Sequence, residues 1–234
     1  MPSADLDLAI ETAVRARCVN SGQSCIAAKR FIVADEIYEA FESRFVKGME
    51  TVHVGDPMKE GTEVGPLATI RALELLEAQV KAAVRVGARI LTGGERMLGE
   101  GNYFEPTVLT GVPRTSAVYR EELFGPVAML FRVQDLNEAI EIANDTPFGL
   151  AASAWTKDLV RAHRAGRDIR AGCVWVNDHI PIISEMPHGG SKASGYGKDM
   201  SAYSFEEYTQ VKHVMYDNTA LARKDWHRTV FGDR

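Results

Sequence analysis

The chain alternates between segments whose apolar residues recur every three or four positions and short runs of β-branched and aromatic residues. The first pattern predicts amphipathic helices, because residues spaced in this way share one helix face. It is clearest over residues 36–52, where Ile37, Phe41, Phe45 and Met49 fall on one face. Four further helices are predicted by the same pattern over residues 3–20, 68–87, 135–146 and 157–169. The second pattern predicts strands within residues 30–35, 88–94, 104–112, 127–133, 150–156 and 172–177.

The regular exchange of strands and helices predicts an α/β fold. We expect a doubly wound, mostly parallel, twisted sheet that helices cover on both faces. The length of 234 residues is sufficient for one large domain of this kind. In such sheets ligands bind beyond the carboxyl ends of the strands. The unusual residues of this chain collect in loops of that type.

Composition narrows the possible partners. Hydrophobic residues make up 45% of the chain and charged residues 25%, which is typical of a globular domain. The net charge of −5 argues against nucleic acid or an anionic membrane as a partner. The amino-terminal residues lack the basic and apolar regions of a secretory signal, and no apolar run is long enough for a membrane span. We therefore expect a cytoplasmic protein.

Three cysteines are present, and one of them stands in an unusual setting. They form no C-x-x-C pair, so neither a disulfide framework nor a metal site is expected. Cys25 follows a Gly-Gln-Ser turn in "VNSGQSCIAAKR". Such a turn can present a thiolate close to backbone N–H groups, which suits a nucleophile. The alternative is a buried, inert thiol, which is the role we expect for Cys18 and Cys173.

Five motifs together resemble the aldehyde dehydrogenase superfamily: "NSGQSC", "REELFGPV", "NDTPFGLAASAWT", "VWVN" and "MPHGGSKASGYGK". They occur in the family's order between about residues 3 and 216. The resemblance covers only the carboxyl-terminal half of the family's sequence. It implies a catalytic domain over residues 1–205, without the amino-terminal NAD(P)-binding domain, which is absent from this chain. It further implies an oligomerisation-type strand over residues 206–217, a tail over residues 218–234, and a homo-oligomer.

The resemblance also implies a reaction, the oxidation of a small aldehyde to a carboxylic acid with NAD or NADP as the acceptor. Cys25 would attack the aldehyde to form a thiohemiacetal, and hydride loss would leave a thioester that water releases. In the family, the residues at the positions of Glu122 and Phe124 hold the nicotinamide-side ribose. A carboxylate can accept hydrogen bonds from ribose hydroxyls, and a ring can pack beside the sugar. The alternative for Glu122 is an exposed carboxylate at a strand end.

The loop "VNDHIPIISEMPHGG" resembles the part of the family that lines the aldehyde tunnel. By position, Ile180, Ile182 and His188 would face the substrate, and an apolar wall with few polar groups suits an aldehyde. The alternative is that this loop is ordinary surface.

The substrate class remains open between two branches of the superfamily. The carboxyl-terminal motif resembles aminobutyraldehyde dehydrogenases, whereas the surroundings of Cys25 resemble succinate-semialdehyde dehydrogenases. In the second branch an arginine six residues before the nucleophile holds the substrate carboxylate. Val19 stands at that position here, with Arg17 nearby in the sequence.

Two function classes therefore remain. The first is the catalytic portion of an aldehyde dehydrogenase. The second is a non-oxidative protein, either a thiol esterase or a binding and assembly module, that retains the fold.

Overall fold

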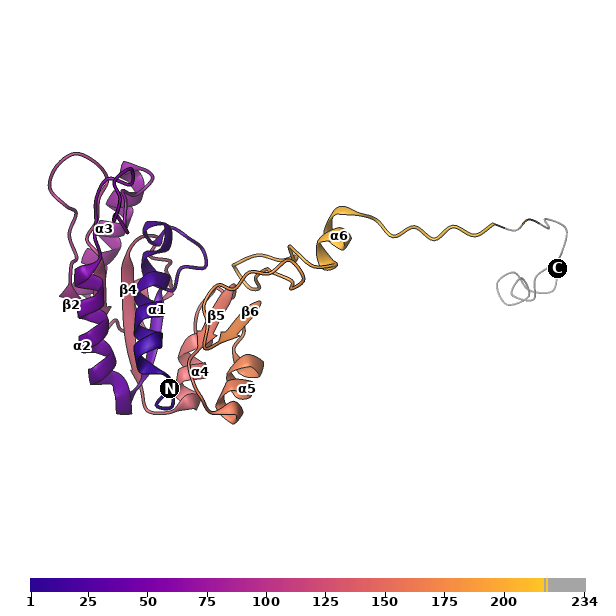
Figure 1. Ribbon diagram of the computed structural model, residues 1–234, viewed down its shortest axis with the longest axis horizontal. Helices are drawn as coiled ribbons and strands as arrows, with labels where there is room; N and C mark the ends of the chain where they lie inside the picture. The colour runs from indigo at the N-terminus through magenta and orange to yellow at the C-terminus, as the bar shows by residue number, and fades with distance from the viewer. Residues whose placement is uncertain (217, 219–234) are drawn as a thin grey trace.

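A computed structural model of the chain describes residues 1–216 and 218 (Figure 1). Six helices and six strands are found in this part of the chain. The helices are α1 (Leu6–Cys18), α2 (Asp35–Thr51), α3 (Ile70–Arg85), α4 (Leu136–Asn144), α5 (Leu159–Asp168) and α6 (Tyr203–Tyr208). The strands are β1 (Arg30–Ala34), β2 (Arg89–Thr92), β3 (Thr107–Thr110), β4 (Val127–Val133), β5 (Ala151–Ala154) and β6 (Cys173–Val176).

The strands form two sheets. In the larger sheet the order is β1-β4-β3-β2, with β1, β4 and β3 parallel and β2 antiparallel at the edge. In the smaller sheet β5 pairs with β6 in parallel. The predicted α/β class and the mostly parallel strands are thus confirmed, but the strands do not join into one continuous sheet within the described residues.

Helices cover both faces of the larger sheet because its central strands are apolar on both sides. Along β4, Ala128 and Leu130 belong to one buried cluster with residues of α1 and α2. Val127 and Met129 belong to a second cluster with residues of α3. Since successive side chains of a strand point to opposite faces, a continuous apolar run such as "VAMLFRV" supplies both cores at once.

Side-chain caps determine where several helices begin. The carboxylates of Asp135 and Asp158 accept hydrogen bonds from backbone N–H groups in the first turns of α4 and α5. Asp5 caps α1 by accepting from Leu8 N–H at 3.3 Å. The hydroxyl of Ser3, which precedes this cap, bonds to that of Thr156 at 2.7 Å.

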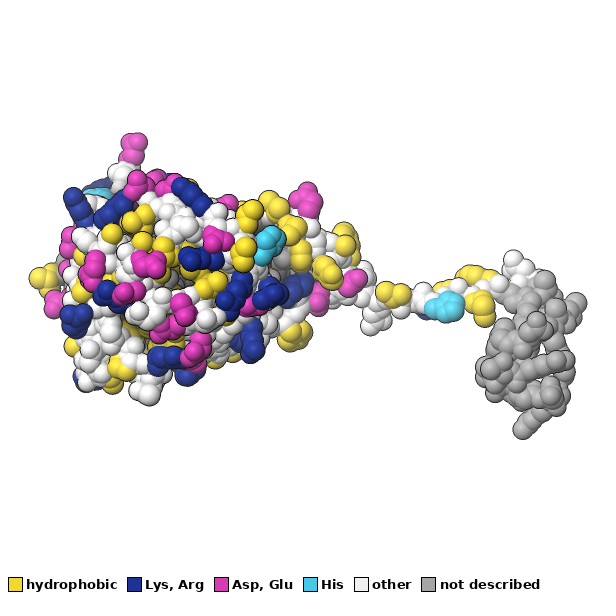
Figure 2. All heavy atoms as spheres, turned by 90° about the horizontal axis from the view of Figure 1, so that it is seen from below, with side chains coloured by type: hydrophobic (Ala, Val, Ile, Leu, Met, Phe, Trp, Pro, Cys, Tyr) yellow, Lys and Arg dark blue, Asp and Glu magenta, His cyan; other side chains and the backbone are white. Residues whose placement is uncertain are grey.

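Residues 206–216 form an arm that extends away from the body (Figure 1). Residues 206–208 belong to α6, and residues 209–216 have no regular secondary structure in the single chain. Hydrophobic side chains gather where the body narrows toward this arm (Figure 2), and along the arm Tyr208 and Val211 are 87% and 99% exposed. The oligomerisation strand stays a prediction, and the tail, apart from residue 218, lies outside the described residues. Among those residues, no helix has the length and apolarity that a membrane crossing requires.

Candidate active site

The nucleophile candidate lies just beyond a strained turn at the end of α1. Residues Val19–Gly22 form a kinked 3₁₀ segment in which Asn20, Ser21 and Gly22 have positive φ angles of 50°, 56° and 73°. Left-handed backbone at non-glycine residues costs on the order of 1–2 kcal/mol each, so other contacts must hold the turn. One of them comes from Gly65, whose N–H donates to the Ser21 hydroxyl at 2.9 Å. The turn leaves Cys25 exposed.

A second loop supports this turn through backbone contact. A Cβ atom placed on Gly22 would lie 2.3 Å from the carbonyl carbon and oxygen of Gly125. Any side chain at position 22 would therefore collide with main chain that cannot move aside easily. Gly125 follows Glu122 and Phe124, so the loop of the predicted cofactor residues lies directly against the nucleophile turn.

Lys29 connects these two loops. Its ammonium group donates to three backbone carbonyl oxygens around the nucleophile, at 3.1, 3.2 and 3.1 Å, which are those of Ser24, Cys25 and Ala27. It also forms an ion pair with Glu122 at 3.0 Å. Burial lowers the pKa of Lys29, and the positive charge of Arg17 lowers it further, while Glu122 opposes both effects. The carbonyl groups of the loop thus turn toward one partly buried cation, which also holds the Glu122 carboxylate.

Arg17 stabilises the same turn through hydrogen bonds to backbone carbonyl groups. Its guanidinium is fully buried and donates to Gly22 O at 2.7 Å and to Val127 O at 3.3 Å. Burial lowers the pKa of Arg17 to about 10, which leaves the group charged at neutral pH. Arg17 therefore binds backbone and is not exposed to a substrate. Although it lies near Val19 in the sequence, it cannot replace the arginine that the succinate-semialdehyde branch carries there.

The other predicted cofactor residue also lies in this region. The ring of Phe124 is 40% exposed, and its centroid lies 5.8 Å from the Lys29 ammonium. The side chain of Glu122 is 36% exposed. The structure therefore brings the backbone of Cys25, the carboxylate of Glu122 and the ring of Phe124 around Lys29, and both Glu122 and Phe124 are partly exposed.

The predicted substrate residues lie on the loop after β6. Ile180 is half-buried with φ of +65°, and Ile182 is 41% exposed. His188 forms an antiparallel bridge with Asp199, with N–H to O distances of 2.8 and 2.7 Å, and its Nε2 is buried without a partner among the described residues. Their place in a substrate tunnel stays a prediction.

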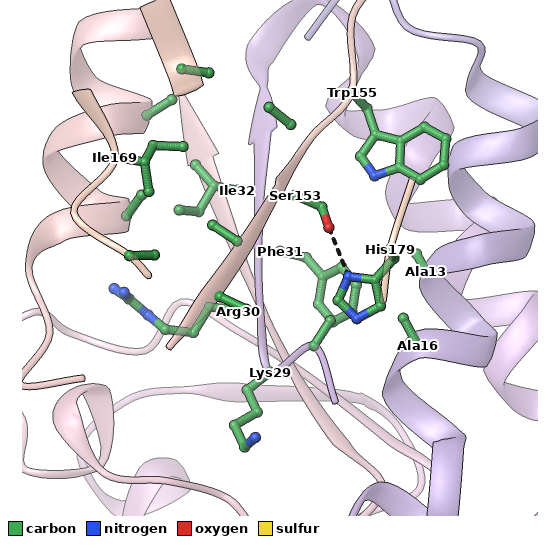
Figure 3. Close-up of a pocket in the computed structure, with 18 of the residues that line it drawn as sticks. Ala13, Ala16, Lys29, Arg30, Phe31, Ile32, Ser153, Trp155, Ile169 and His179 are labelled. Atoms are coloured by element: carbon green, nitrogen blue, oxygen red, sulfur yellow. Dashed lines mark hydrogen bonds between the residues drawn. The ribbon is translucent and has the colours of Figure 1, made fainter. Parts of the chain in front are cut away.

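His179 is a site residue that the sequence analysis missed. Its Nε2 lies 3.1 Å from Ile26 O and its Nδ1 lies 2.7 Å from the Ser153 hydroxyl, as Figure 3 shows for Ser153. A carbonyl oxygen can only accept, so Nε2 carries the proton and Nδ1 accepts from Ser153. Through these two hydrogen bonds the imidazole links Ile26, the residue after Cys25, to Ser153 on β5. The one signal in the sequence was a histidine within a loop that has few charged residues.

The protonation of His179 gives a testable pH dependence. Burial lowers the pKa of this imidazole, so the folded chain binds its proton less readily than the unfolded chain, whose pKa is about 6.5. The stability that His179 contributes is present above pH 6.5 and is lost as the pH falls. We expect His179→Gln to lower the free energy of unfolding by about 1–2 kcal/mol at pH 8, and by less at pH 5. Urea unfolding of both proteins at several pH values measures this, and a pH-independent difference would contradict it.

The three thiols should differ strongly in reactivity. Cys25 is exposed, Cys173 is partly buried, and Cys18 is buried. Burial raises the pKa of Cys18 to about 12, so almost no thiolate forms there at pH 8. With limiting iodoacetamide we expect Cys25 to be alkylated at least about tenfold faster than either other thiol. Peptide mapping of the native protein measures the order, with Cys25→Ser as the control, and preferential labelling of Cys18 or Cys173 would refute it.

Comparison with known proteins gives consistent matches. A sequence model described as "Aldehyde dehydrogenase family" matches residues 1–214. A succinate-semialdehyde dehydrogenase [NADP(+)] 1 of Mycobacterium ulcerans (strain Agy99) is 47% identical, and an aldehyde dehydrogenase of Paenarthrobacter nicotinovorans is 49% identical. Each alignment covers 214 residues, 92% of this chain and 47% of the relative. The chain thus spans about half the length of the curated relatives it matches.

Solved structures agree with the sequence matches. Lactaldehyde dehydrogenase from Escherichia coli superimposes with a TM-score of 0.87 at 36% identity, over 90% of this chain and 44% of that one. Betaine aldehyde dehydrogenase from Staphylococcus aureus, in complex with NAD+, superimposes with a TM-score of 0.85 at 33% identity, over 88% of this chain and 42% of that one. The fold described above is therefore the fold of half of each of these proteins.

Proposed function

The chain belongs to the aldehyde dehydrogenase family, and on that premise we propose that it is the catalytic portion of an NAD(P)-dependent enzyme that oxidises a small aldehyde to a carboxylic acid. The observation that carries this proposal is the grouping of the loop of the exposed Cys25 with Glu122 and Phe124 around one partly buried ammonium, that of Lys29. Hydride transfer requires the nucleophile and the cofactor contacts to lie near each other, and the contacts that Lys29 makes with both loops support this proposal.

Cys25 has the central chemical role in the proposed mechanism. Its thiolate attacks the aldehyde carbon, and the carbonyl oxygen takes up negative charge. Because Lys29 holds the carbonyl groups of this loop inward, the N–H of Cys25 is our candidate donor to that oxygen. Glu122 and Phe124 would hold a nicotinamide cofactor, which would supply the acceptor for the hydride of the substrate carbon. Cys25 then holds the acyl group as a thioester until water releases the acid, and the general base for that step would come from the other half of the family's sequence.

Glu122 and Phe124 suit the ribose of such a cofactor. One oxygen of Glu122 is paired with Lys29, which leaves the second oxygen to accept from a ribose hydroxyl. The accessible ring of Phe124 can pack against the sugar. NAD and NADP are both kept as acceptors in this proposal. Glu122 and Phe124 would contact the ribose beside the nicotinamide, and neither would contact the adenosine or its 2′ position.

The substrate class follows less directly. Several relatives are named succinate-semialdehyde dehydrogenases, but Val19 is apolar and Arg17 is enclosed by backbone. We therefore favour a small aldehyde without a carboxylate bound at this position. Ile180, Ile182 and His188 are the proposed tunnel residues, and the exposed arm over residues 206–216 is the proposed contact with a second subunit in a homo-oligomer.

The test joins the chain to the part of its relatives that its alignment does not cover. A fusion of the chain behind the cofactor domain of a relative should produce NADH or NADPH from aldehydes, whereas the chain alone should not. Succinate semialdehyde, aminobutyraldehyde and simple aliphatic aldehydes would form the panel. A folded fusion that binds the cofactor but oxidises none of them would reject the proposal in favour of a binding or assembly module.

A further inference from the structure

The turn that carries the candidate nucleophile is closed by one backbone hydrogen bond. Ala27 N–H donates to Ser24 O at 3.1 Å, so Cys25 and Ile26 are the two central residues of a four-residue turn. Within residues 1–216, neither the N–H of Cys25 nor that of Ile26 forms a hydrogen bond. Successive unpaired N–H groups in a turn can bind negative charge. The turn therefore offers two successive donors, one on the nucleophile and one on the residue that follows it.

The carbonyl groups of the same peptide units face one cation. The ammonium of Lys29 lies 3.1 Å from Ser24 O and 3.2 Å from Cys25 O. The peptide bonds of this turn are trans, and in a trans peptide unit the C=O and the N–H that follows it point in opposite directions. By holding these two carbonyl groups, Lys29 therefore directs the N–H groups of Cys25 and Ile26 away from itself.

The hydrogen bonds of Lys29 leave it no donor for a substrate. An ammonium group has three N–H donors, and four oxygen atoms lie within 3.2 Å of this one. Three of them are carbonyl oxygens of the turn, and the fourth is Oε1 of Glu122. Lys29 therefore acts on a substrate at Cys25 through the backbone that it holds.

His179 fixes the remaining peptide unit of the turn. Its Nε2 donates to Ile26 O at 3.1 Å, and the N–H on the other side of that peptide unit is the one of Ala27 that closes the turn on Ser24 O. The hydroxyl of Ser153 holds the imidazole in place through Nδ1, at 2.7 Å (Figure 3). Side chains thus hold all three peptide units between Ser24 and Ala27 through their carbonyl groups.

We propose that the N–H of Ile26 is a second donor to the oxygen of the tetrahedral adduct at Cys25, beside the N–H of Cys25 itself, and that Lys29 is the positioning residue that aims both groups. This inference rests on the proposed function, because it takes Cys25 as the nucleophile. Donors that are held in place before the substrate arrives need no reorganisation when the oxygen becomes charged. The pair suits any carbonyl compound that a thiolate converts to an oxyanion, such as an aldehyde or an activated ester.

Two reactions of Cys25, measured in the chain itself at pH 8, test the proposal. Acylation by p-nitrophenyl acetate passes through an oxyanion: the thiolate attacks the ester carbon, a C–S bond forms, and the C–O bond breaks as p-nitrophenolate leaves with its electron pair. Alkylation by iodoacetamide displaces iodide from a saturated carbon and develops no oxyanion. Both reactions require the thiolate, so the ratio of their rates reports on stabilisation of the oxyanion alone.

Removal of either part of the arrangement should lower this ratio. Replacement of Ile26 by its α-hydroxy acid analogue turns its N–H into an ester oxygen and so removes the donor. Lys29→Met removes the ammonium that holds the carbonyl groups. We expect each variant to lower the ratio of acylation to alkylation by at least about tenfold.

Two controls match these variants in chemistry. The same ester replacement at Ala28 removes an N–H that donates to Ala16 O at 3.0 Å, and Lys81→Met removes an exposed ammonium that is paired with Glu77. Both should keep the ratio within about twofold of the parent chain, because neither changes the turn. Circular dichroism and urea unfolding show whether each variant is folded.

The possible outcomes separate this inference from the proposed function. A ratio that falls in Lys29→Met but not in the Ile26 ester would show that Lys29 acts by its charge alone, and would overturn the inference. A fall in the ester alone, with Lys29→Met folded and unchanged, would overturn the role of Lys29, and the ester decides the inference if Lys29→Met does not fold. Acylation that continues at the parent rate in Cys25→Ser would instead reject the nucleophile, and with it the proposed function.

Discussion

Replacement of Cys25 by alanine, in a fusion of this chain with a relative's cofactor domain, is expected to reduce aldehyde oxidation by roughly 10⁴-fold or more, about 5.5 kcal/mol in activation free energy. Without the thiol, no covalent adduct forms, and hydride would have to leave from the free aldehyde or its hydrate. The surroundings would remain intact, because Cys25 is exposed and its side chain supports no core packing. Binding of the cofactor should therefore survive while turnover is lost.

The measurement is the rate of NADH or NADPH formation at saturating aldehyde. Cys173→Ala is the matched control, because it removes a partly buried thiol from β6 and should keep activity within about threefold. Cofactor binding, followed by calorimetry, shows whether each fusion is folded. Activity that persists in Cys25→Ala would assign the chemistry to another group and remove Cys25 from the proposed mechanism.

The largest expected change in stability comes from Arg17→Met. Methionine keeps much of the apolar volume of the arginine stem but has no donor. Gly22 O and Val127 O would then lose the guanidinium in a site that water does not reach. A buried acceptor that is left without a partner costs about 1–3 kcal/mol. We therefore expect the free energy of unfolding to fall by roughly 2–4 kcal/mol.

Urea unfolding of the chain measures the loss, and Arg17→Lys provides the comparison. Lysine keeps the charge but cannot reach two carbonyl groups with one planar fork, so its effect should be intermediate. The Cys25 turn should also loosen in Arg17→Met, which faster proteolysis near Gly22 would report. A variant as stable as the parent chain would show that water or neighbouring groups replace the guanidinium.

Periodicity was sufficient to predict the main elements of this fold. The apolar face of Ile37, Phe41 and Phe45 predicted α2, and the six apolar runs each contain one of the six strands. These signals are local, since they depend on neighbours three or four residues away or on the next residue but one. The division into two sheets is not local, and no pattern of neighbouring residues predicts it.

The supporting residues of the site were missed for the same reason. Arg17 acts on Val127, Lys29 on Glu122, and His179 on Ile26, and each of these pairs is distant in the sequence. Their side chains belong to ordinary helix, strand and loop positions, so no spacing distinguishes them. A motif resemblance directs attention to Cys25 and Glu122, whereas the cations that hold the surrounding backbone become visible only in three dimensions.

The contact between Gly22 and Gly125 affects how this site can be altered. Because the two backbones touch, the loops that carry Cys25 and Glu122 have no side chain between them to absorb a change in either one. If one loop were replaced by the corresponding loop of a distant relative, its backbone would no longer fit against the backbone of the other loop. Donor segments should therefore be exchanged as a pair, and natural variation in one loop should be accompanied by compensating variation in the other.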